Sequence, residues 1–250
     1  NTLVGSSPTA RTKKMKLVKN FINIITLLII SSSMQISANE LEEKIKNYIL
    51  NNPQIIIESL NNFEKQKQNE KKVDNKKKIN VFKSEIFNSE SLYEGNKSSQ
   101  KIIVEFFDYN CSYCKRAHAD LKKIISENKD IKVIYKNFPI LSDRSVELAK
   151  YALIISELGN AKFIRFHNYL LKQKGKINDN DLDLILKELN IDKAFLNKKL
   201  KDDSINSKLQ NDYDLANNLG LNGTPAFVIG DEIIFGYISK KELLSRLNQQ

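Results

Sequence analysis

Apolar and polar residues alternate along the chain in a pattern that predicts an ordered series of helices and strands. Two apolar runs, residues 102–107 and 131–139, are typical of buried parallel strands. The segment between them, through about Asn128, has its apolar residues at helical spacing and Asn110 in position to cap its start. One face of this helix is predicted to be apolar: Cys114, Ala117, Leu121, Ile124 and Ile125. This register turns Cys114 toward the core and leaves Cys111 at the exposed end of the helix.

The second half of the chain continues with helices and ends with a hairpin. Residues 142–220 show successive helical periods, with stops at Gly159 and Gly220 and a short turn near residues 195–200. Two apolar runs, 226–229 and 232–235, flank Gly230-Asp231, a dipeptide typical of two-residue hairpin turns. Ser239 and Glu242 have capping-box spacing and predict a C-terminal helix. This order predicts an α/β fold with a thioredoxin-like core and an inserted helical domain.

Residues 39–83 form an N-terminal helical arm ahead of this core. Asn51-Asn52-Pro53 stops a first short helix, and Pro53 can open a second one. Residues 64–80 are almost wholly polar, which predicts a solvated helix or linker. The apolar faces within residues 41–49 and 56–63 are too small to form a core, so we expect them to pack on the main domain or on another copy of the chain.

Residues 1–38 have the pattern of a secretory signal peptide. Lysines precede an apolar stretch of about ten residues, 21–30, and small polar residues lead to a predicted cleavage site after Ala38. This apolar stretch is too short to span a bilayer, which needs about 20 residues. An uncleaved membrane anchor is the alternative. Because Met15 would begin a compact leader, we expect residues 1–14, which show no structural pattern, to lie outside the native product.

The net charge of +10 does not indicate a nucleic-acid partner. Residues 1–38 carry five of these charges and no acid, so the rest of the chain has a net charge of about +5. The basic residues of this remaining part are interleaved with acidic ones, and they form no stripe of basic and aromatic residues. We therefore expect no nucleic-acid binding.

Cys111 and Cys114 are the only cysteines in the sequence. A strand, then Cys-x-x-Cys, then a helix is the layout of a thioredoxin-type redox centre. The unpaired N–H groups and partial positive charge of a helix N-terminus stabilise a thiolate, and typical shifts lower a cysteine pKa from about 8.5 to about 3.5–7.5. In an oxidising compartment a single close pair is suited to chemistry rather than to stapling the fold.

With Cys111-x-x-Cys114 after a strand and Gly223-Thr-Pro-Ala-Phe-Val-Ile-Gly230 about 110 residues later, residues 84–250 resemble the DsbA-like branch of the thioredoxin superfamily. The resemblance implies that Cys111 is the attacking thiolate and Cys114 the resolving thiol. It also implies that Pro225 follows a cis bond and faces the disulfide, with Thr224 before it. An ordinary trans proline at the start of a strand is the alternative.

Glu105 matches the buried acid behind the active site of this family. Burial should raise its pKa, and it could exchange a proton with Cys114. The alternative is a strand-end carboxylate paired with Lys132 or Lys136.

The resemblance implies a protein-disulfide oxidoreductase that promotes disulfide formation in exported proteins of the periplasm. Its expected partners are exported proteins with free thiols, bound at Ser112, Tyr113, Thr224 and Pro225, and a membrane redox partner that reoxidises or reduces the pair. No cofactor is implied. Ser112-Tyr113 and Thr224 resemble the isomerase branch, and the arm resembles the oligomerising arms of related proteins. An oligomeric isomerase or reductase, with residues 39–83 joining the copies, is the alternative.

Two other classes of protein stay open at this point. Cys111, Cys114, His118 and His167 could supply a Cys2His2 zinc site, since His118 lies one turn past Cys114. We expect no metal, because thioredoxin topology should keep His167 distant, at a helix edge, with His118 on a helix surface. A structural envelope protein with an incidental disulfide is the other alternative.

Overall fold

The computed structural model describes residues 8–88 and 92–249 and divides into two compact units, residues 1–68 and 69–250. The N-terminal unit contains α1 (Pro8–Asn51) and the first part of α2 (Gln54–Val81). The predicted stop at residues 51–53 is confirmed. Within the described residues, no helix combines the length and the apolar character that a membrane crossing requires.

Helix α1 is much longer than the sequence pattern predicted. It includes residues 8–14, for which we expected no structure, and it continues through Ala38 into the predicted short helix at residues 41–49. Between Pro8 and Pro53 the chain has no glycine or proline, so no residue in this stretch interrupts backbone hydrogen bonding. Residues 1–7 of the predicted leader lie outside the described residues.

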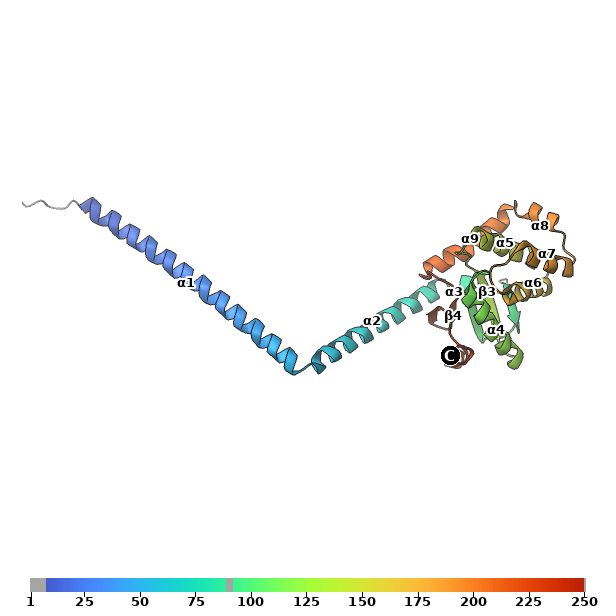
Figure 1. Ribbon diagram of the computed structural model, residues 1–250, viewed down its shortest axis with the longest axis horizontal. Coiled ribbons are helices and arrows are strands. Elements are labelled where there is room, and N and C mark those ends of the chain that lie inside the picture. The colour runs from blue at the N-terminus through green and yellow to red at the C-terminus, as the bar shows by residue number, and fades with distance from the viewer. Residues whose placement is uncertain (1–7, 89–91, 250) are drawn as a thin grey trace, which may run out of the picture. The chain divides into compact units, whose positions relative to one another are not determined.

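A five-stranded mixed sheet forms the centre of the C-terminal unit, in the order β1-β3-β2-β4-β5 (Figure 1). Strands β2 and β3 are parallel, with Val104 opposite Ile134, and the other neighbours are antiparallel. Strands β2, β3, β4 and β5 lie where the sequence pattern predicted strands. Strand β1 and the short α3 were missed, because each is four residues long and carries no clear period. The bounds are β1 (Leu92–Gly95), β2 (Ile102–Phe107), β3 (Lys132–Asn137), β4 (Ala226–Ile229), β5 (Glu232–Phe235) and α3 (Lys83–Ile86).

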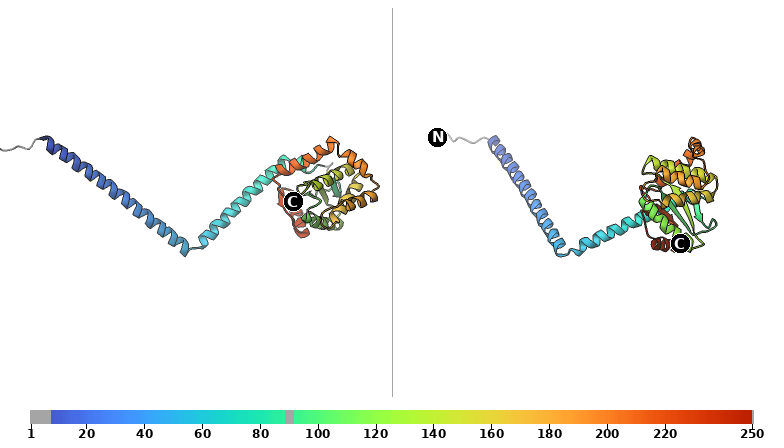
Figure 2. Two further views of the ribbon diagram at one scale, coloured as in Figure 1. Left: turned by 45° about the horizontal axis from the view of Figure 1, so that its top comes forward. Right: turned by 45° about the vertical axis from the view of Figure 1, so that its right-hand side comes forward.

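The helices after the first strands also confirm the predicted order. The inserted helices are grouped together beside the sheet (Figures 1 and 2). Gly159 ends α5 with φ +120°, a backbone conformation that favours glycine. The predicted turn near residues 195–200 is a helix, α8, and the capping box at Ser239 is present. The bounds are α4 (Ser112–Glu127), α5 (Asp143–Glu157), α6 (Asn160–Lys172), α7 (Asp179–Glu188), α8 (Lys193–Lys199), α9 (Asp203–Asn218) and α10 (Lys240–Leu247).

The two faces of the sheet have separate apolar cores. Successive residues of a strand point to opposite faces, so Ile103 and Phe107 enter one core and Val104 and Phe106 the other. The first core is completed by α4, α10 and the inserted helices, and the second by α3, the end of α9 and Ile79 of α2. Glu105 has the parity of Ile103 and Phe107, which places it on the α4 face.

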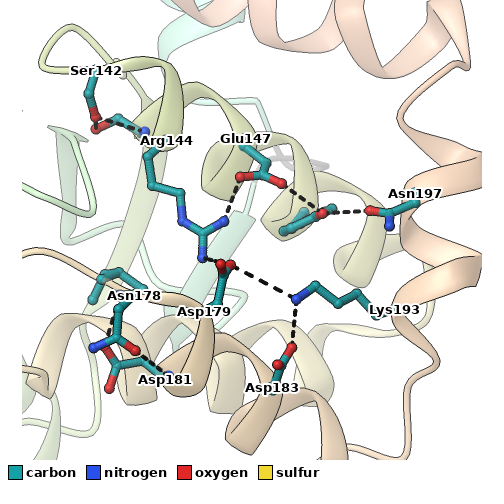
Figure 3. Close-up of polar contacts among 12 residues, drawn as sticks. Ser142, Arg144, Glu147, Asn178, Asp179, Asp181, Asp183, Lys193 and Asn197 are labelled. Atoms are coloured by element: carbon teal, nitrogen blue, oxygen red, sulfur yellow. Dashed lines mark hydrogen bonds and ion pairs between the residues drawn. The ribbon is translucent and has the colours of Figure 1, made fainter.

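Polar contacts join three of the inserted helices (Figure 3). Arg144 of α5 donates to Glu147 at 2.6 Å and to Asp179 at the start of α7 at 3.0 Å. Lys193 of α8 lies 3.9 Å from the same Asp179 carboxylate. Because exposed ion pairs are worth about 0–1 kcal/mol each, they orient these helices while the buried apolar residues stabilise them.

The C-terminal part of α2 belongs to the C-terminal unit. Ile79 is 2% exposed in the second core, and Lys76 pairs with Asp231 of the β4–β5 turn at 2.6 Å. The polar stretch 64–80 is therefore helical, and one apolar residue near its end attaches it to the unit. The division between units falls after residue 68, and the functional boundary at 83/84 stays a prediction.

Candidate active site

Cys111 is the N-cap residue of α4, with φ −78° and ψ 118°, and its Sγ accepts a hydrogen bond from the Cys114 N–H at 3.4 Å. The prediction of Asn110 as the cap was wrong. The Asn110 side chain instead connects the active-site loop to the insertion, because it donates to the Ser145 hydroxyl at 3.0 Å and accepts from the Ile177 N–H at 2.9 Å. These long-range partners position the residue just before the redox pair.

Cys111 is buried, so the expectation that it lies at an exposed helix end was wrong. Its exposed fraction is 7%, and that of Cys114 is 0%. The reason is a loop far along the sequence: the Thr224 carbonyl oxygen accepts from the Cys111 thiol at 3.2 Å and covers it. Both cysteines are free thiols in this structure. The small exposed fraction of Cys111 is the part of the pair that a substrate can reach.

The two sulfurs differ strongly in acidity. The hydrogen bond between the two cysteine side chains, together with the backbone N–H groups of Tyr113 and Cys114, lowers the pKa of Cys111 to about 6. Burial raises the pKa of Cys114 well above its ordinary value, and the hydrogen bond to Cys111 and the charge of Glu105 add to this. At neutral pH the reduced pair is therefore a thiolate at Cys111 and a thiol at Cys114.

The residues predicted to meet substrate lie around Cys111. The Thr224–Pro225 peptide bond is cis, as expected, and Pro225 directly precedes β4. Ser112 and Tyr113 follow Cys111 at the start of α4, and Tyr113 is 58% exposed. The structure thus brings together Cys111, Cys114 and Thr224 at one place, with an exposed aromatic ring beside them.

Glu105 is fully buried in β2, opposite Tyr135 of β3 and Phe227 of β4. Its carboxyl oxygens have no hydrogen-bond partner within residues 8–88 and 92–249. Burial, and then the charge of Cys111, raises its pKa well above the ordinary value, which is the direction that the sequence predicted. The charge of the Cys111 thiolate thus acts on the Glu105 carboxyl, and the Glu105 charge acts on Cys114.

The alternative partners of Glu105 are engaged elsewhere. The Lys132 ammonium lies 5.2 Å from the centre of the Tyr93 ring, and Lys136 pairs with Asp212 at 3.6 Å. The pairing of Glu105 with either lysine is therefore not what the structure shows.

Both histidines lie in the core, so their predicted positions at a helix surface and a helix edge were wrong. His118 is 1% exposed and His167 0%, and their ring centres are 5.4 Å apart. Helix α6 packs on α4 and brings His167, which the sequence analysis expected to be distant, against His118. The Tyr109 hydroxyl lies 3.1 Å from His167 Nδ1. Burial is the main cause that lowers the pKa of His118 to about 3 and that of His167 well below its ordinary value, so both rings are neutral.

The described residues include no group of three or more His, Cys, Asp and Glu side chains arranged to hold a metal ion. The zinc alternative therefore has no support from the geometry.

Asp108 is a site residue that the sequence analysis missed. Its carboxylate accepts from the N–H groups of Asn110 at 2.8 Å and Leu141 at 3.0 Å, which holds the loop between β2 and α4. An Asp directly after a buried strand, two residues before Asn110, is the local signal of such a turn. Its second partner, Leu141, comes from beyond β3 and has no such signal.

Parallel strands β2 and β3, a cysteine capping the helix between them and a cis-proline loop over that cysteine define the class of thioredoxin-fold thiol–disulfide oxidoreductases. The chain belongs to the family of the DSBA-like thioredoxin domain, whose sequence profile matches residues 102–248. A second profile, that of the copper resistance protein ScsC N-terminal domain, matches residues 39–70.

Solved structures and curated proteins are similar to this chain. The thiol-disulfide exchange protein alpha-DsbA2 from Wolbachia pipientis is 34% identical, with 71% of this chain and 96% of that chain covered and a TM-score of 0.66. ScsC from Proteus mirabilis in a transitional conformation is 27% identical, with 85% and 96% covered and a TM-score of 0.63. A Rickettsia typhi protein that carries the name of a protein-disulfide oxidoreductase is 33% identical over 87 residues, which are 33% of this chain and 31% of that protein.

The chain spans between 21% and 31% of the length of the curated relatives it matches, which include Na(+)/H(+) antiporters of Salinispora.

Proposed function

We propose that this protein is a protein-disulfide oxidoreductase that forms disulfide bonds in exported proteins through the Cys111–Cys114 pair. The observation that carries the proposal is the asymmetry of the pair: Cys111 has a pKa of about 6 and Cys114 is a buried thiol with a raised pKa. A cysteine of low pKa leaves a mixed disulfide more readily than one of high pKa, and its thiolate is the reactive nucleophile. This arrangement therefore suits exchange at Cys111.

The proposed reaction begins with the pair oxidised. A substrate thiolate attacks Cys111 Sγ, the Cys111–Cys114 bond breaks, and Cys114 leaves as a thiolate that takes up a proton. A second substrate thiolate then attacks the substrate sulfur of the mixed disulfide, and Cys111 leaves as a thiolate. Two electrons pass from the substrate thiols to the pair, which a redox partner of the membrane must reoxidise.

Glu105 is the proposed proton partner of Cys114. Burial raises its pKa, so it holds a proton to a higher pH than an ordinary carboxyl does, and in its charged form it raises the pKa of Cys114. Thr224, Pro225, Ser112 and Tyr113 are proposed to contact the substrate peptide around Cys111. The position of the Thr224 carbonyl, 3.2 Å from Cys111 Sγ, supports this role for the loop.

The reduction potential of the pair tests the proposed function. In glutathione buffers the protein should interconvert reversibly between dithiol and disulfide. Below pH 6 reduction of the disulfide takes up two protons with two electrons, so the reduction potential should fall by about 59 mV per pH unit. Above pH 6 Cys111 stays a thiolate, only one proton is taken up, and the potential should fall by about 30 mV per pH unit. An unfolded peptide of residues 106–116 is the control and should show its break near pH 8.5. A break at that pH in the protein would contradict the assignment.

The proposed location is the periplasm, reached through a signal peptide within residues 1–38. The basic and then apolar pattern of that segment supports export. The single cysteine pair supports an oxidising compartment in which a dithiol does chemistry and is reoxidised. Exported proteins with free thiols and a membrane redox protein are the proposed partners.

We also propose that the arm joins copies of the chain. The apolar side chains of α1 and α2 in this segment are exposed, with Leu41 at 59%, Leu60 at 57% and Phe63 at 57%, and the ScsC N-terminal profile matches residues 39–70. An oligomer would place several Cys111 sites in one particle and would favour reshuffling of wrong disulfides. This supports the isomerase as the second candidate function.

Light scattering on residues 39–250 and 69–250 tests the arm. The shorter protein keeps Ile79, which is buried in the core of its unit, so it should fold and be a monomer. Residues 39–250 should be an oligomer, and Leu60→Glu should dissociate it by placing a charge in the apolar face, whereas the control Lys65→Glu should not. If residues 39–250 are monomeric, the isomerase loses its structural basis and the simple oxidant stands.

A further inference from the structure

A groove of about 630 Å³ begins beside the redox pair and follows α4. One wall is the face of α4 that starts at Ser112, the residue after Cys111, and the other is the end of α6 with the loop that follows it. Neither this groove nor another cavity, around α9 and Asp212, has a cysteine in its lining, but the groove begins at Ser112, the residue directly after Cys111. The groove along α4 is therefore a cavity next to the chemistry.

The groove is strongly basic. Five cationic side chains and no Asp or Glu are among the described residues that line it: Lys115, Arg116, Lys122, Lys172 and Lys174. Lys122 pairs with Glu94, Lys115 donates to the Gly175 carbonyl, and Arg116 lies 4.4 Å from the centre of the Tyr237 ring. In the part of the chain that the structure describes, Lys172 and Lys174 form no ion pair and are exposed. Their charges are free to meet an external anion.

His118 supplies a second, independent observation. It lines the groove, is 1% exposed, and neither ring nitrogen has a hydrogen-bond partner among the described residues. Buried polar groups are normally hydrogen-bonded, so this ring is an unsatisfied polar group just beneath the wall of the groove.

The dimensions of the groove fit a peptide. From Ser112 to Lys122 the helix advances by ten residue steps, a rise of about 15 Å. An extended peptide covers that distance in about five residues. A substrate whose cysteine is at Cys111 could therefore lay the next few residues along α4.

We propose that this groove binds an acidic stretch of the substrate protein that flanks its reactive cysteine, and so selects substrates by charge. The proposal rests on the proposed function, because it assigns a substrate preference to the same redox site. Lys172 and Lys174 are the specificity-determining residues, since their charges are unpaired and lie at the open edge of the groove. Attraction across such a surface acts mainly on the rate of encounter and falls with ionic strength.

Two synthetic dithiol peptides test the proposal with the oxidised full chain. They share one central cysteine pair and differ in their flanks, which are four Asp and Glu residues on each side or the matching Asn and Gln. At low ionic strength kcat/KM for the acidic peptide should exceed that for the neutral one by about tenfold, as expected for several surface charge pairs. In 1 M NaCl, where the Debye length is about 3 Å, the two values should converge.

The double variant Lys172→Glu/Lys174→Glu should lose the preference, because its kcat/KM for the acidic peptide should fall to that for the neutral one or below it. Lys198→Glu/Lys201→Glu, on α8 and just after it, makes the same change in net charge away from the groove and should keep the preference. Equal rates for both peptides in the wild type, or equal loss in both variants, would overturn the proposal while leaving exchange intact. No exchange with either peptide would overturn the proposed function itself.

Discussion

The Cys114→Ala protein should accumulate as stable mixed disulfides with its substrates, all through Cys111. In the reduced protein the Cys111 thiolate attacks a substrate disulfide and forms the mixed disulfide. In the wild type Cys114 then attacks Cys111 Sγ within the same molecule and releases the substrate thiolate, which is the reverse of the first step of oxidation. Effective molarities of such oriented groups reach about 10⁵ M or more, so its removal should slow resolution by at least about 10³-fold. Non-reducing electrophoresis and mass spectrometry of the trapped species measure this directly.

Cys111→Ser is the matched control for this trap. Cys114 is fully buried and its pKa is raised, so it should neither replace Cys111 as nucleophile nor form mixed disulfides. Turnover should be lost in both variants, but only the alanine variant should carry substrate. Equal trapping through either cysteine would show that the two sulfurs are equivalent and would remove the asymmetry on which the proposed mechanism depends.

Glu105→Gln should slow the release and uptake of the Cys114 proton and reduce turnover by about 10²-fold, the usual size of a positioned acid–base group. Glutamine has nearly the same shape but does not titrate, so the variant keeps the packing of β2. Stopped-flow measurement of each exchange step should place the loss where Cys114 changes protonation, with little change in the first alkylation of Cys111. The exposed Glu127→Gln is a control and should behave as wild type.

Glu105→Gln should also change how the free energy of unfolding depends on pH. Burial raises the pKa of Glu105 above its unfolded value, so its contribution to folding is complete below that unfolded value, near pH 4.5, and is lost as the pH rises through the folded pKa. As the pH is raised from 4.5, the free energy of unfolding of Glu105→Gln should therefore increase relative to that of the wild type. His118 and His167 titrate in both proteins, so the difference between the two curves isolates Glu105. A constant difference across this range would show that Glu105 has an ordinary pKa in the fold.

Much of the fold could be predicted from local sequence. Strand β2, helix α4, strand β3 and the hairpin of β4 and β5 follow from periodicity and turn residues, and the capping box at Ser239 is visible as two residues at the right spacing. Strand β1 could not be predicted, because four residues at a sheet edge leave almost no pattern. The full length of α1 was missed because amphipathic spacing was used as the signal, whereas the backbone needed only the absence of glycine and proline.

By itself, the sequence determined which residues are candidates for the chemistry and on which element each one lies. Cys111 and Cys114 at the start of a helix, Glu105 within a buried strand and Pro225 before another strand are all local facts, set by nearest neighbours and by the period of each element. The direction of the Glu105 pKa shift follows from the same source, since a carboxyl within an apolar strand is buried by the strand's own partners.

Only the tertiary structure decided the surroundings of those residues. The burial of Cys111 under the Thr224 carbonyl, the contact of His118 with His167 and the basic groove between α4 and the end of α6 each join segments far apart in the chain. Local periodicity shows whether a side chain faces a core but not which segment covers it. The histidines were misplaced for this reason: a polar ring on a helix suggests solvent until a second helix packs over it.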